Sequence, residues 1–242
     1  SPPPQQPSAR HFLHKRSHLV IATGAANHRG RDTLVAVGQP QTIEAKFAYG
    51  PVDKDLHDED VLIERELEDG RAEAIGTART SADSDHDDGG RIHFTIPSDR
   101  ALPLGEHTLR LTVVGDGTQT HLSLIVVSKD QPVFVSDVDG TLTASEVAEF
   151  PALARGELPD AHPHAAKAFQ LLRERGYIPI YLTARPEWLL GRTRAFLREH
   201  GFPSGIVCTK RDKSGGYGDS AATFKKMELD RIAHLGVRIE WA

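Results

Sequence analysis

Cysteine is almost absent from this chain of 242 residues, because Cys208 is the only one. A single cysteine excludes an internal disulfide and any zinc site built from several cysteines, although it does not assign a redox compartment. Long apolar runs are absent too, and none approaches the roughly 18 residues that a membrane-spanning helix needs. The sequence therefore predicts a soluble or peripheral protein and leaves its compartment open.

An excess of basic residues is also lacking. The chain has 29 Lys and Arg against 34 Asp and Glu, which gives a net charge of -5 at pH 7. We therefore expect no nucleic-acid partner, and any anion binding must be local. With 38% hydrophobic and 26% charged residues, the chain has the composition of a folded protein. At roughly 100 to 200 residues per domain, it has room for one large domain or two ordinary ones.

Residues 1–16 are predicted to form a Pro-rich and basic lead-in. A stretch with many prolines is typical of an extended linker, and a first residue other than methionine is expected for a processed or trimmed start. The basic patch that follows could contact an anionic membrane surface. A solvated lead-in to the first strand is the favoured interpretation. The patch consists of Arg10, His11, His14, Lys15, Arg16 and His18.

Residues 17–130 show the pattern of an all-β domain. Residues 108–113 alternate between polar and apolar, which places one face in a core and the other in water. Turn sequences such as Gly115-Asp116-Gly117 separate the runs, and there is no convincing helix. These features predict an immunoglobulin-like sandwich. The expected strands cover residues 19–23, 42–49, 61–66, 91–96, 108–114 and 121–127.

An acidic tract in this half has the alternate spacing of a calcium loop. An EF-hand needs a bidentate Glu at its twelfth position, and counting from the first aspartate that position is Phe94. Flanking helices are also lacking. We therefore interpret the tract as a solvated hairpin turn rather than an ion site. It consists of Asp83, Asp85, Asp87, Asp88 and Gly89.

Residues 131–242 show a different periodicity, with short apolar strands that alternate with helix patterns. This order predicts parallel strands joined by crossovers, and hence an open three-layer α/β sheet. The short segment 145–160 leaves no room for a large cap after the first strand. The expected strands are 133–135, 178–182, 205–208 and 237–241, and the expected helices are 165–175, 189–200 and 222–235.

Two carboxylates follow the first buried strand, and in such sheets ligands bind at the carboxyl ends of the strands. Asp137 could attack phosphorus, and Asp139 could protonate the leaving oxygen and later activate water. Gly140 lets the backbone turn sharply, so that the amides beyond it, including that of Thr141, can face phosphate oxygens. Asp-Gly is also a common turn, but the strand directly before it favours a site.

Further polar residues occur at the later strand ends. Thr183 follows the second strand and can bond a phosphate oxygen, although a lone threonine is more often a helix cap. Lys225, at the start of the last helix, can neutralise both the attacking carboxylate and the phosphate. Lys210 and Arg211 follow the third strand and could contact a phosphate headgroup, or form a solvated basic loop.

The motif Asp137-Val138-Asp139-Gly140-Thr141, then Thr183 and Lys225, resembles the first three motifs of the haloacid-dehalogenase-like (HAD) superfamily of phosphatases. More narrowly, residues 139–145, 181–186, 200–207 and 224–225 resemble the catalytic LNS2 domain shared by lipins and the membrane-associated phosphatidylinositol-transfer proteins. The resemblance covers about residue 133 to the end of the chain.

The resemblance implies a role for each motif residue. Asp137 is the nucleophile, Asp139 the acid/base, Thr183 the phosphate-binding hydroxyl and Lys225 the charge stabiliser. Magnesium is bound by the Asp137 carboxylate and the Asp139 backbone carbonyl. In lipins the substrate is phosphatidic acid, and a sandwich domain packs on the catalytic one. The transfer-protein relatives lack the nucleophile and are thought to sense phosphatidic acid, so the presence of Asp137 favours catalysis.

One departure from the family pattern concerns the metal. The fourth motif, an acidic residue that completes the magnesium site, follows the strand that corresponds to residues 237–241, and the sequence stops at Ala242. Gly218-Asp219-Ser220 looks similar but precedes Lys225, in the wrong order. We therefore expect an incomplete metal site, as in a fragment or an impaired enzyme.

Three functions stay open at this point. The favoured one is a magnesium-dependent phosphomonoester phosphatase acting on a phosphorylated small molecule or a phospholipid headgroup such as phosphatidic acid, with peripheral membrane contact. The second is a non-catalytic phosphatidate-binding sensor module. The third makes the sandwich the main functional part, as an adhesion or interaction domain.

Overall fold

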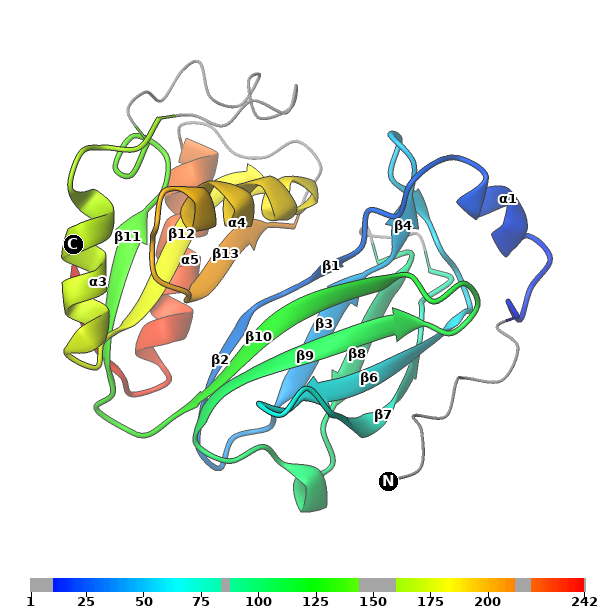
Figure 1. Cartoon of the computed structure of the whole chain (residues 1–242), viewed down its shortest axis with the longest axis horizontal. Helices are drawn as coiled ribbons and strands as arrows, with labels where there is room; N and C mark the ends of the chain where they lie inside the picture. The colour runs from blue at the N-terminus through cyan, green and yellow to red at the C-terminus, as the bar shows by residue number, and fades with distance from the viewer. Residues whose placement is uncertain (1–10, 84–87, 144–159, 212–218, 242) are drawn as a thin grey trace. The chain divides into compact units, whose positions relative to one another are not determined.

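The computed structural model describes residues 11–83, 88–143, 160–211 and 219–241 (Figure 1). The chain folds into two compact units. Unit 1 comprises Ser1–Gly30, Thr42–Ala101 and His107–Leu122, and unit 2 comprises Arg31–Gln41, Leu102–Glu106 and Ser123–Ala242. The expected domain limits at residues 16/17 and 130/131 stay predictions.

The first half of the chain forms two main sheets and a short hairpin. One sheet has the order β1-β3-β8, a second has the order β2-β10-β9-β6-β7, and β4 pairs with β5. Most pairs are antiparallel, but β10 pairs with β2 in parallel. The strands are β1 (Arg29–Gly30), β2 (Thr33–Ala36), β3 (Thr42–Lys46), β4 (Ala48–Tyr49), β5 (Lys54–Asp55), β6 (Asp60–Glu66), β7 (Ala72–Arg79), β8 (Arg91–Thr95), β9 (Gly105–Val113) and β10 (Gln119–Val127).

Within unit 1, the two sheets pack face to face over an apolar core. Leu109, Leu111 and Val113 of β9 are buried, and the residues between them are more exposed, as the alternation predicts. Gly76 of β7 faces Phe94 of β8, and a Cβ on Gly76 would lie 2.5 Å from the tip of the Phe94 ring. Glycine therefore allows the two sheets to approach here. The finer, immunoglobulin-like assignment remains a prediction.

The expected strand at residues 19–23 was wrong, because this segment belongs to a short helix, α1 (Ser17–Ile21). The buried carboxylate of Glu59 accepts hydrogen bonds from the backbone N–H groups of Leu13 and His14 and from the Ser17 hydroxyl. These bonds satisfy donors just before and at the start of the helix. A run of five residues is too short for its periodicity to separate helix from strand.

Other sequence expectations for this half differ in detail. The expected strand 42–49 is interrupted at Phe47, whose backbone N–H donates to Gly90. Strands β2 and β7 were not expected. The acidic tract from Asp83 to Gly89 lies partly outside the described residues. A short 3-10 helix, η2 (Ser98–Arg100), also occurs in this half.

The second half contains the expected parallel sheet. Its strand order is β13-β12-β11-β14, and all three pairings are parallel. The elements are β11 (Pro132–Asp137), α3 (Ala165–Glu174), β12 (Ile178–Pro186), η3 (Glu187–Leu189), α4 (Leu190–Glu199), β13 (Ile206–Lys210), α5 (Asp219–Ala233) and β14 (Arg238–Trp241).

Helices cover both faces of this sheet (Figure 1). On one face, Ile232 and the partly buried Phe224 and Leu229 of α5 pack against alternate strand residues. On the other, Phe169 of α3 and Phe196 of α4 join a second cluster. All residues of β12 are buried, as expected for a central strand covered on both faces. Among the described helices, none has the length and apolar character needed to cross a membrane.

Candidate functional site

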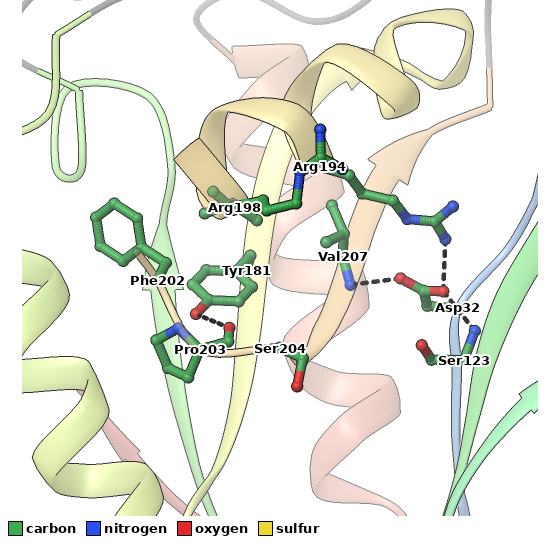
Figure 2. A pocket seen from close by; sticks show the side chains of 11 residues that line it. Asp32, Ser123, Tyr181, Arg194, Arg198, Phe202, Pro203, Ser204 and Val207 are labelled. Atoms are coloured by element: carbon green, nitrogen blue, oxygen red, sulfur yellow. Dashed lines mark hydrogen bonds and ion pairs between the residues drawn. The ribbon is translucent and has the colours of Figure 1, made fainter. Parts of the chain in front are cut away.

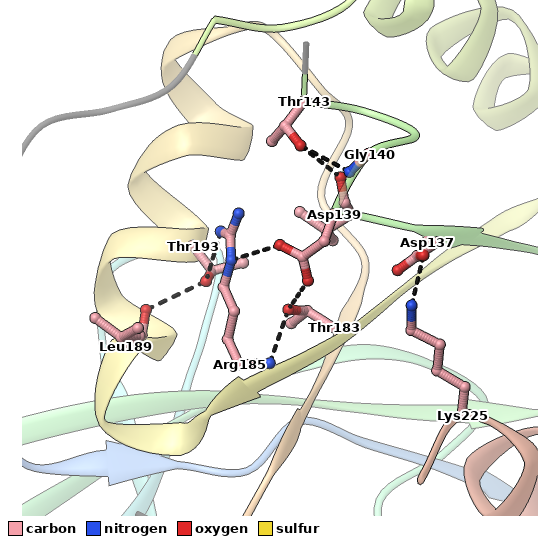
Figure 3. A network of polar contacts seen from close by, with 10 residues as sticks. Asp137, Asp139, Gly140, Thr143, Thr183, Arg185, Leu189, Thr193 and Lys225 are labelled. Carbon is pink, nitrogen blue, oxygen red and sulfur yellow. Dashed lines mark hydrogen bonds and ion pairs between the residues drawn. The ribbon is translucent and has the colours of Figure 1, made fainter. Parts of the chain in front are cut away.

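The carboxyl ends of the two central strands bring the predicted acidic motif and Thr183 together. Asp137 is the last residue of β11, and it lies opposite Leu182 of β12 in the parallel register. Thr183 is the next residue of β12, and Asp139 lies in the turn after β11. Because parallel strands end at the same edge of a sheet, these side chains converge there (Figure 3).

Asp137 forms an ion pair with Lys225, in the first half of α5. The Lys225 Nζ lies 2.5 Å from Asp137 Oδ2. The other oxygen, Oδ1, is buried and has no hydrogen-bond partner among the described residues. Burial raises the pKa of the Asp137 carboxyl, and Lys225 opposes this shift. One carboxylate oxygen is thus paired with Lys225, and the other is buried outside that pair.

Asp139 is held through both of its carboxylate oxygens. The Thr183 hydroxyl donates to Oδ2 at 2.7 Å, and Arg185 Nε lies 2.7 Å from Oδ1 (Figure 3). The Thr183 oxygen also accepts the backbone N–H of Arg185, at 3.1 Å. Thr183 is fully buried, and in this conformation its hydroxyl serves Asp139. Asp139 therefore has a fixed orientation beside Asp137.

Arg185 is a residue of the site to which sequence reasoning assigned no role. It is buried, and one of its terminal nitrogens donates to the Thr193 hydroxyl of α4 at 3.4 Å. The available signal was its position two residues after Thr183 on an extended strand, since alternate residues face the same side. The expected strand 178–182 was too short to reveal this, because β12 continues to Pro186.

Gly140 and Thr141 form the turn beyond Asp139. Gly140 has a φ of +74°, a conformation that favours glycine. Its backbone N–H donates to the hydroxyl of Thr143 at 3.0 Å, and Thr141 is exposed. In this conformation the Gly140 amide is therefore used within the turn, and Thr141 remains accessible.

Lys210 and Arg211 lie at the carboxyl end of β13, the strand next to β12. Lys210 Nζ donates to the Ser220 hydroxyl at the start of α5, at 2.7 Å. Arg211 follows directly and is exposed. Both residues are thus at the same sheet edge as Asp137, although no contact between them and the two aspartates is found.

The donor set matches magnesium only in part. Asp137 Oδ1 is a buried carboxylate oxygen without a hydrogen-bond partner, which suits a hard cation that prefers oxygen ligands. Within the described ranges, however, no group of three or more His, Cys, Asp or Glu side chains is placed to hold a metal ion. Asp219 is exposed at the start of α5. The described residues thus supply the Asp137 oxygen but no full set of carboxylates.

Unit 2 also contains a cavity of about 310 Å³, which includes none of the predicted site residues (Figure 2). Asp32 is buried in its wall and accepts hydrogen bonds from Arg194, Ser123 N and Val207 N. Burial raises the pKa of the Asp32 carboxyl, and these three donors oppose the shift. Residues 204–205, which directly precede β13, also line the cavity. The cavity therefore lies at the amino end of β13, whereas Asp137 lies at the carboxyl ends of the strands.

Two family models match the chain. One is described as the β-sandwich domain of PITM 1-3 and matches residues 26–126; the other is described as the LNS2 domain of PITM 1-3 and matches residues 134–241. Membrane-associated phosphatidylinositol transfer protein 1 of Rattus norvegicus is 34% identical over 196 residues, which are 80% of this chain and 15% of the relative.

Two other relatives have similar identities. Protein retinal degeneration B of Drosophila melanogaster is 32% identical over 84% of this chain and 15% of its own length. Membrane-associated phosphatidylinositol transfer protein 3 of Homo sapiens is 30% identical over 81% of this chain and 19% of its own length. The chain thus spans less than a fifth of these relatives. It carries the β-sandwich and LNS2 domains of PITM 1-3 and is homologous to the membrane-associated phosphatidylinositol transfer proteins.

Proposed function

We propose that the chain is a HAD-type phosphatase that hydrolyses a phosphomonoester through a phosphorylated Asp137. The observation that carries this proposal is the state of the Asp137 carboxylate. One oxygen is paired with Lys225 at 2.5 Å, and the other is buried without a hydrogen-bond partner among the described residues. A nucleophile needs such a free oxygen together with a cation that stabilises the charge of the phosphoryl group.

In the first half of the reaction, Asp137 attacks phosphorus and the bond from phosphorus to the ester oxygen breaks. A protonated Asp139 gives its proton to that oxygen, so an alcohol leaves and Asp139 becomes a carboxylate. In the second half, Asp139 takes a proton from water, and the resulting hydroxide releases phosphate from Asp137. The ion pair of Asp139 with Arg185 corresponds to the carboxylate form, which is the form needed as base.

Magnesium, when bound, would neutralise part of the phosphate charge; the Asp137 carboxylate and the Asp139 backbone carbonyl are the groups that would hold it. Lys225 supplies one positive charge of the chain itself at the same place. Lys210 and Arg211, at the end of the neighbouring strand, are the candidates to hold the substrate's headgroup.

The proposed substrate is phosphatidic acid or a related phospholipid monoester. Its support is the homology to proteins that are named as membrane-associated phosphatidylinositol transfer proteins, together with the resemblance to lipins. A phospholipid headgroup and peripheral membrane contact are accordingly the proposed partners.

A second candidate is a non-catalytic phosphatidate-binding module. The relatives are named as transfer proteins, not as phosphatases. Both oxygens of Asp139 are also occupied, by Thr183 and Arg185, which is compatible with a static anion site. The Asp137–Lys225 pair favours catalysis, because a sensor has no need of a nucleophile with a free oxygen.

Phosphate release from short-chain phosphatidate and from nitrophenyl phosphate, with and without magnesium, separates the two candidates. We expect magnesium-dependent release that falls by several orders of magnitude in Asp137→Asn. The matched control is Asp230→Asn, which makes the same chemical change at an exposed carboxylate on α5. Binding of phosphatidate without release by the native chain would favour the sensor and overturn the enzyme proposal.

A further inference from the structure

The start of the described chain is a basic surface within an acidic protein. Residues 1–31 contain no Asp or Glu, whereas the whole chain has a net charge of -5. In and before α1, His14, Lys15 and His18 are exposed. The side chain of Lys15 has no hydrogen bond or ion pair with any described residue. This end of unit 1 therefore presents the accessible positive charge of Lys15 with no acidic residue of its own segment beside it.

An apolar side chain stands beside this charge on α1. Leu19 is 75% exposed, the highest value among the exposed large hydrophobic residues of the described chain. The helix is not loose, because the buried Glu59 carboxylate holds the backbone of Leu13 and His14 and the Ser17 hydroxyl. The sandwich thus presents Leu19 to solvent on a fixed support.

A second exposed apolar side chain lies on the adjoining turn. The backbone N–H of Asp53 donates to Gly50, so Val52 sits at the tip of a tight turn, where it is 74% exposed. Turn tips usually carry Gly, Asn, Asp or Ser. Valine is not a turn former, and its apolar side chain is exposed to water here without burial in the sandwich core. A Cβ on Gly50 would lie 2.6 Å from Thr23 O, so this turn abuts the segment that leaves α1.

The acidic residues around this turn are neutralised within the sandwich. Asp53 is paired with Arg29, Asp58 with Arg16, and Asp55 with Lys46. Lys54, in contrast, is exposed, and its side chain forms no ion pair or hydrogen bond with any described residue. The accessible charge of this end is therefore positive, and Leu19 and Val52, the two most exposed large hydrophobic residues of the described ranges, lie within it.

We propose that this end of the sandwich, here called the α1 face and defined by Lys15, His18, Leu19, Val52 and Lys54, docks on the surface of an anionic lipid bilayer. Exposed cations next to apolar side chains suit such a surface, since the cations meet lipid headgroups while the apolar groups enter the boundary with the acyl chains. The inference names where the membrane contact of the proposed function occurs, and it does not require phosphatase activity.

Sedimentation with vesicles that contain about one fifth phosphatidylserine and no phosphatidate tests the α1 face without involving the catalytic site. We expect the native chain to sediment with these vesicles far more than with neutral ones. The double variant Leu19→Glu/Val52→Glu should bind at least about tenfold more weakly. Leu104→Glu is the matched control, because Leu104 is 56% exposed but lies outside the α1 face, and it should bind like the native chain.

A second measurement reports insertion directly. An environment-sensitive dye on Leu19→Cys should shift its emission to the blue with anionic vesicles, and the same dye on Leu104→Cys should not. Labelling is selective because Cys208 is buried and burial raises the pKa of its thiol to about 12. Equal sedimentation of the native chain and the double variant, or an unchanged dye spectrum at position 19, would overturn the proposal. If the sedimentation and dye results are as expected but the chain releases no phosphate, only the enzyme proposal is overturned.

Discussion

Arg185 Nε lies 2.7 Å from Asp139 Oδ1, and the arginine side chain is almost completely buried. Thr183 holds the other oxygen of the same carboxylate. Arg185 is therefore a positioning residue for the proposed acid/base, since it acts on the reaction only through Asp139. With both oxygens held, the Asp139 carboxylate has a fixed orientation beside Asp137, which an ordinary Asp-Gly turn would not give it.

Replacing Arg185 should affect the reaction in a way that depends on the leaving group. In Arg185→Lys, Asp139 loses its planar partner, so kcat for an alkyl phosphate should fall by about 10²-fold. Nitrophenyl phosphate needs little protonation of its leaving oxygen, so its kcat should fall much less. Steady-state kinetics of the native chain and Arg185→Lys with both substrates measure the two losses in kcat. Equal losses for the two would assign Arg185 a purely structural role.

Replacing Lys225 should alter the titration of Asp137. Lys225 opposes the rise that burial causes in the Asp137 pKa, so Lys225→Met should raise this pKa further. Because Asp137 reacts as the carboxylate, the acidic limb of the pH–rate profile should move to higher pH, and kcat should fall by about 10²- to 10³-fold. Lys226→Met is the control on the neighbouring exposed lysine. If the acidic limb of Lys225→Met lies at the same pH as that of the native chain, Lys225 does not control the titration of Asp137.

The stability of unit 1 should decrease in mild acid because of His28. Burial lowers the pKa of His28 from 6.5 to about 4, and its ring contacts Thr118 and the backbone of Ala48. The unfolded chain binds this proton near pH 6.5 and the folded chain only near pH 4. The stability is therefore complete above pH 6.5 and declines as the pH falls toward 4, by about 3 kcal/mol.

Urea unfolding of the native chain and of His28→Gln at pH 7 and pH 4.5 measures this effect. The variant should be less stable at pH 7 but should lose less stability on acidification, since it has no histidine to titrate at this position. The same loss in both proteins would show that other groups cause the acid sensitivity.

A side chain at Gly76 should destabilise the sandwich. A Cβ there would lie 2.5 Å from the Phe94 ring, so Gly76→Ala should force the ring to move and cost about 1 to 3 kcal/mol of unfolding free energy. Gly191→Ala is the matched control, because nothing lies within 4 Å of its Cβ position and it is in α4. There alanine should stabilise the protein by about 0.5 to 1 kcal/mol. The denaturant midpoint should fall in Gly76→Ala and rise in Gly191→Ala. A shift in the same direction in both variants would contradict the close contact of Gly76 with Phe94.

The parallel sheet was predictable from the sequence, because buried strands appear as unbroken apolar runs separated by helix patterns. The strand 133–135 was expected and is part of β11, and the sheet is parallel as predicted. The β-sandwich was also predicted and is confirmed by the family model. The alternation along β9 was visible for the same reason, since one of its faces is buried and the other is not.

Tertiary contacts decided the features that the sequence did not reveal. Helix α1 depends on Glu59, more than 40 residues away, so its own residues resemble a strand. Strand β7 is an edge strand with few buried residues, and its apolar pattern is weak. Arg185 acquires its role only where β12 passes Asp139 and α4 supplies Thr193. Local alternation could place Arg185 on the same side of the strand as Thr183, but it does not encode the contacts of Arg185 or those of α1.

The most direct test of the proposed chemistry is to trap the phosphoryl group on Asp137. The native chain is mixed with magnesium and a short-chain phosphatidate, quenched in acid and treated with borohydride, which reduces an acyl phosphate to an alcohol. Peptide mass spectrometry then locates the reduced residue. We expect reduction at Asp137, dependent on substrate and absent in Asp137→Asn. Rapid phosphate release by the native chain without any substrate-dependent reduction at Asp137 would contradict it.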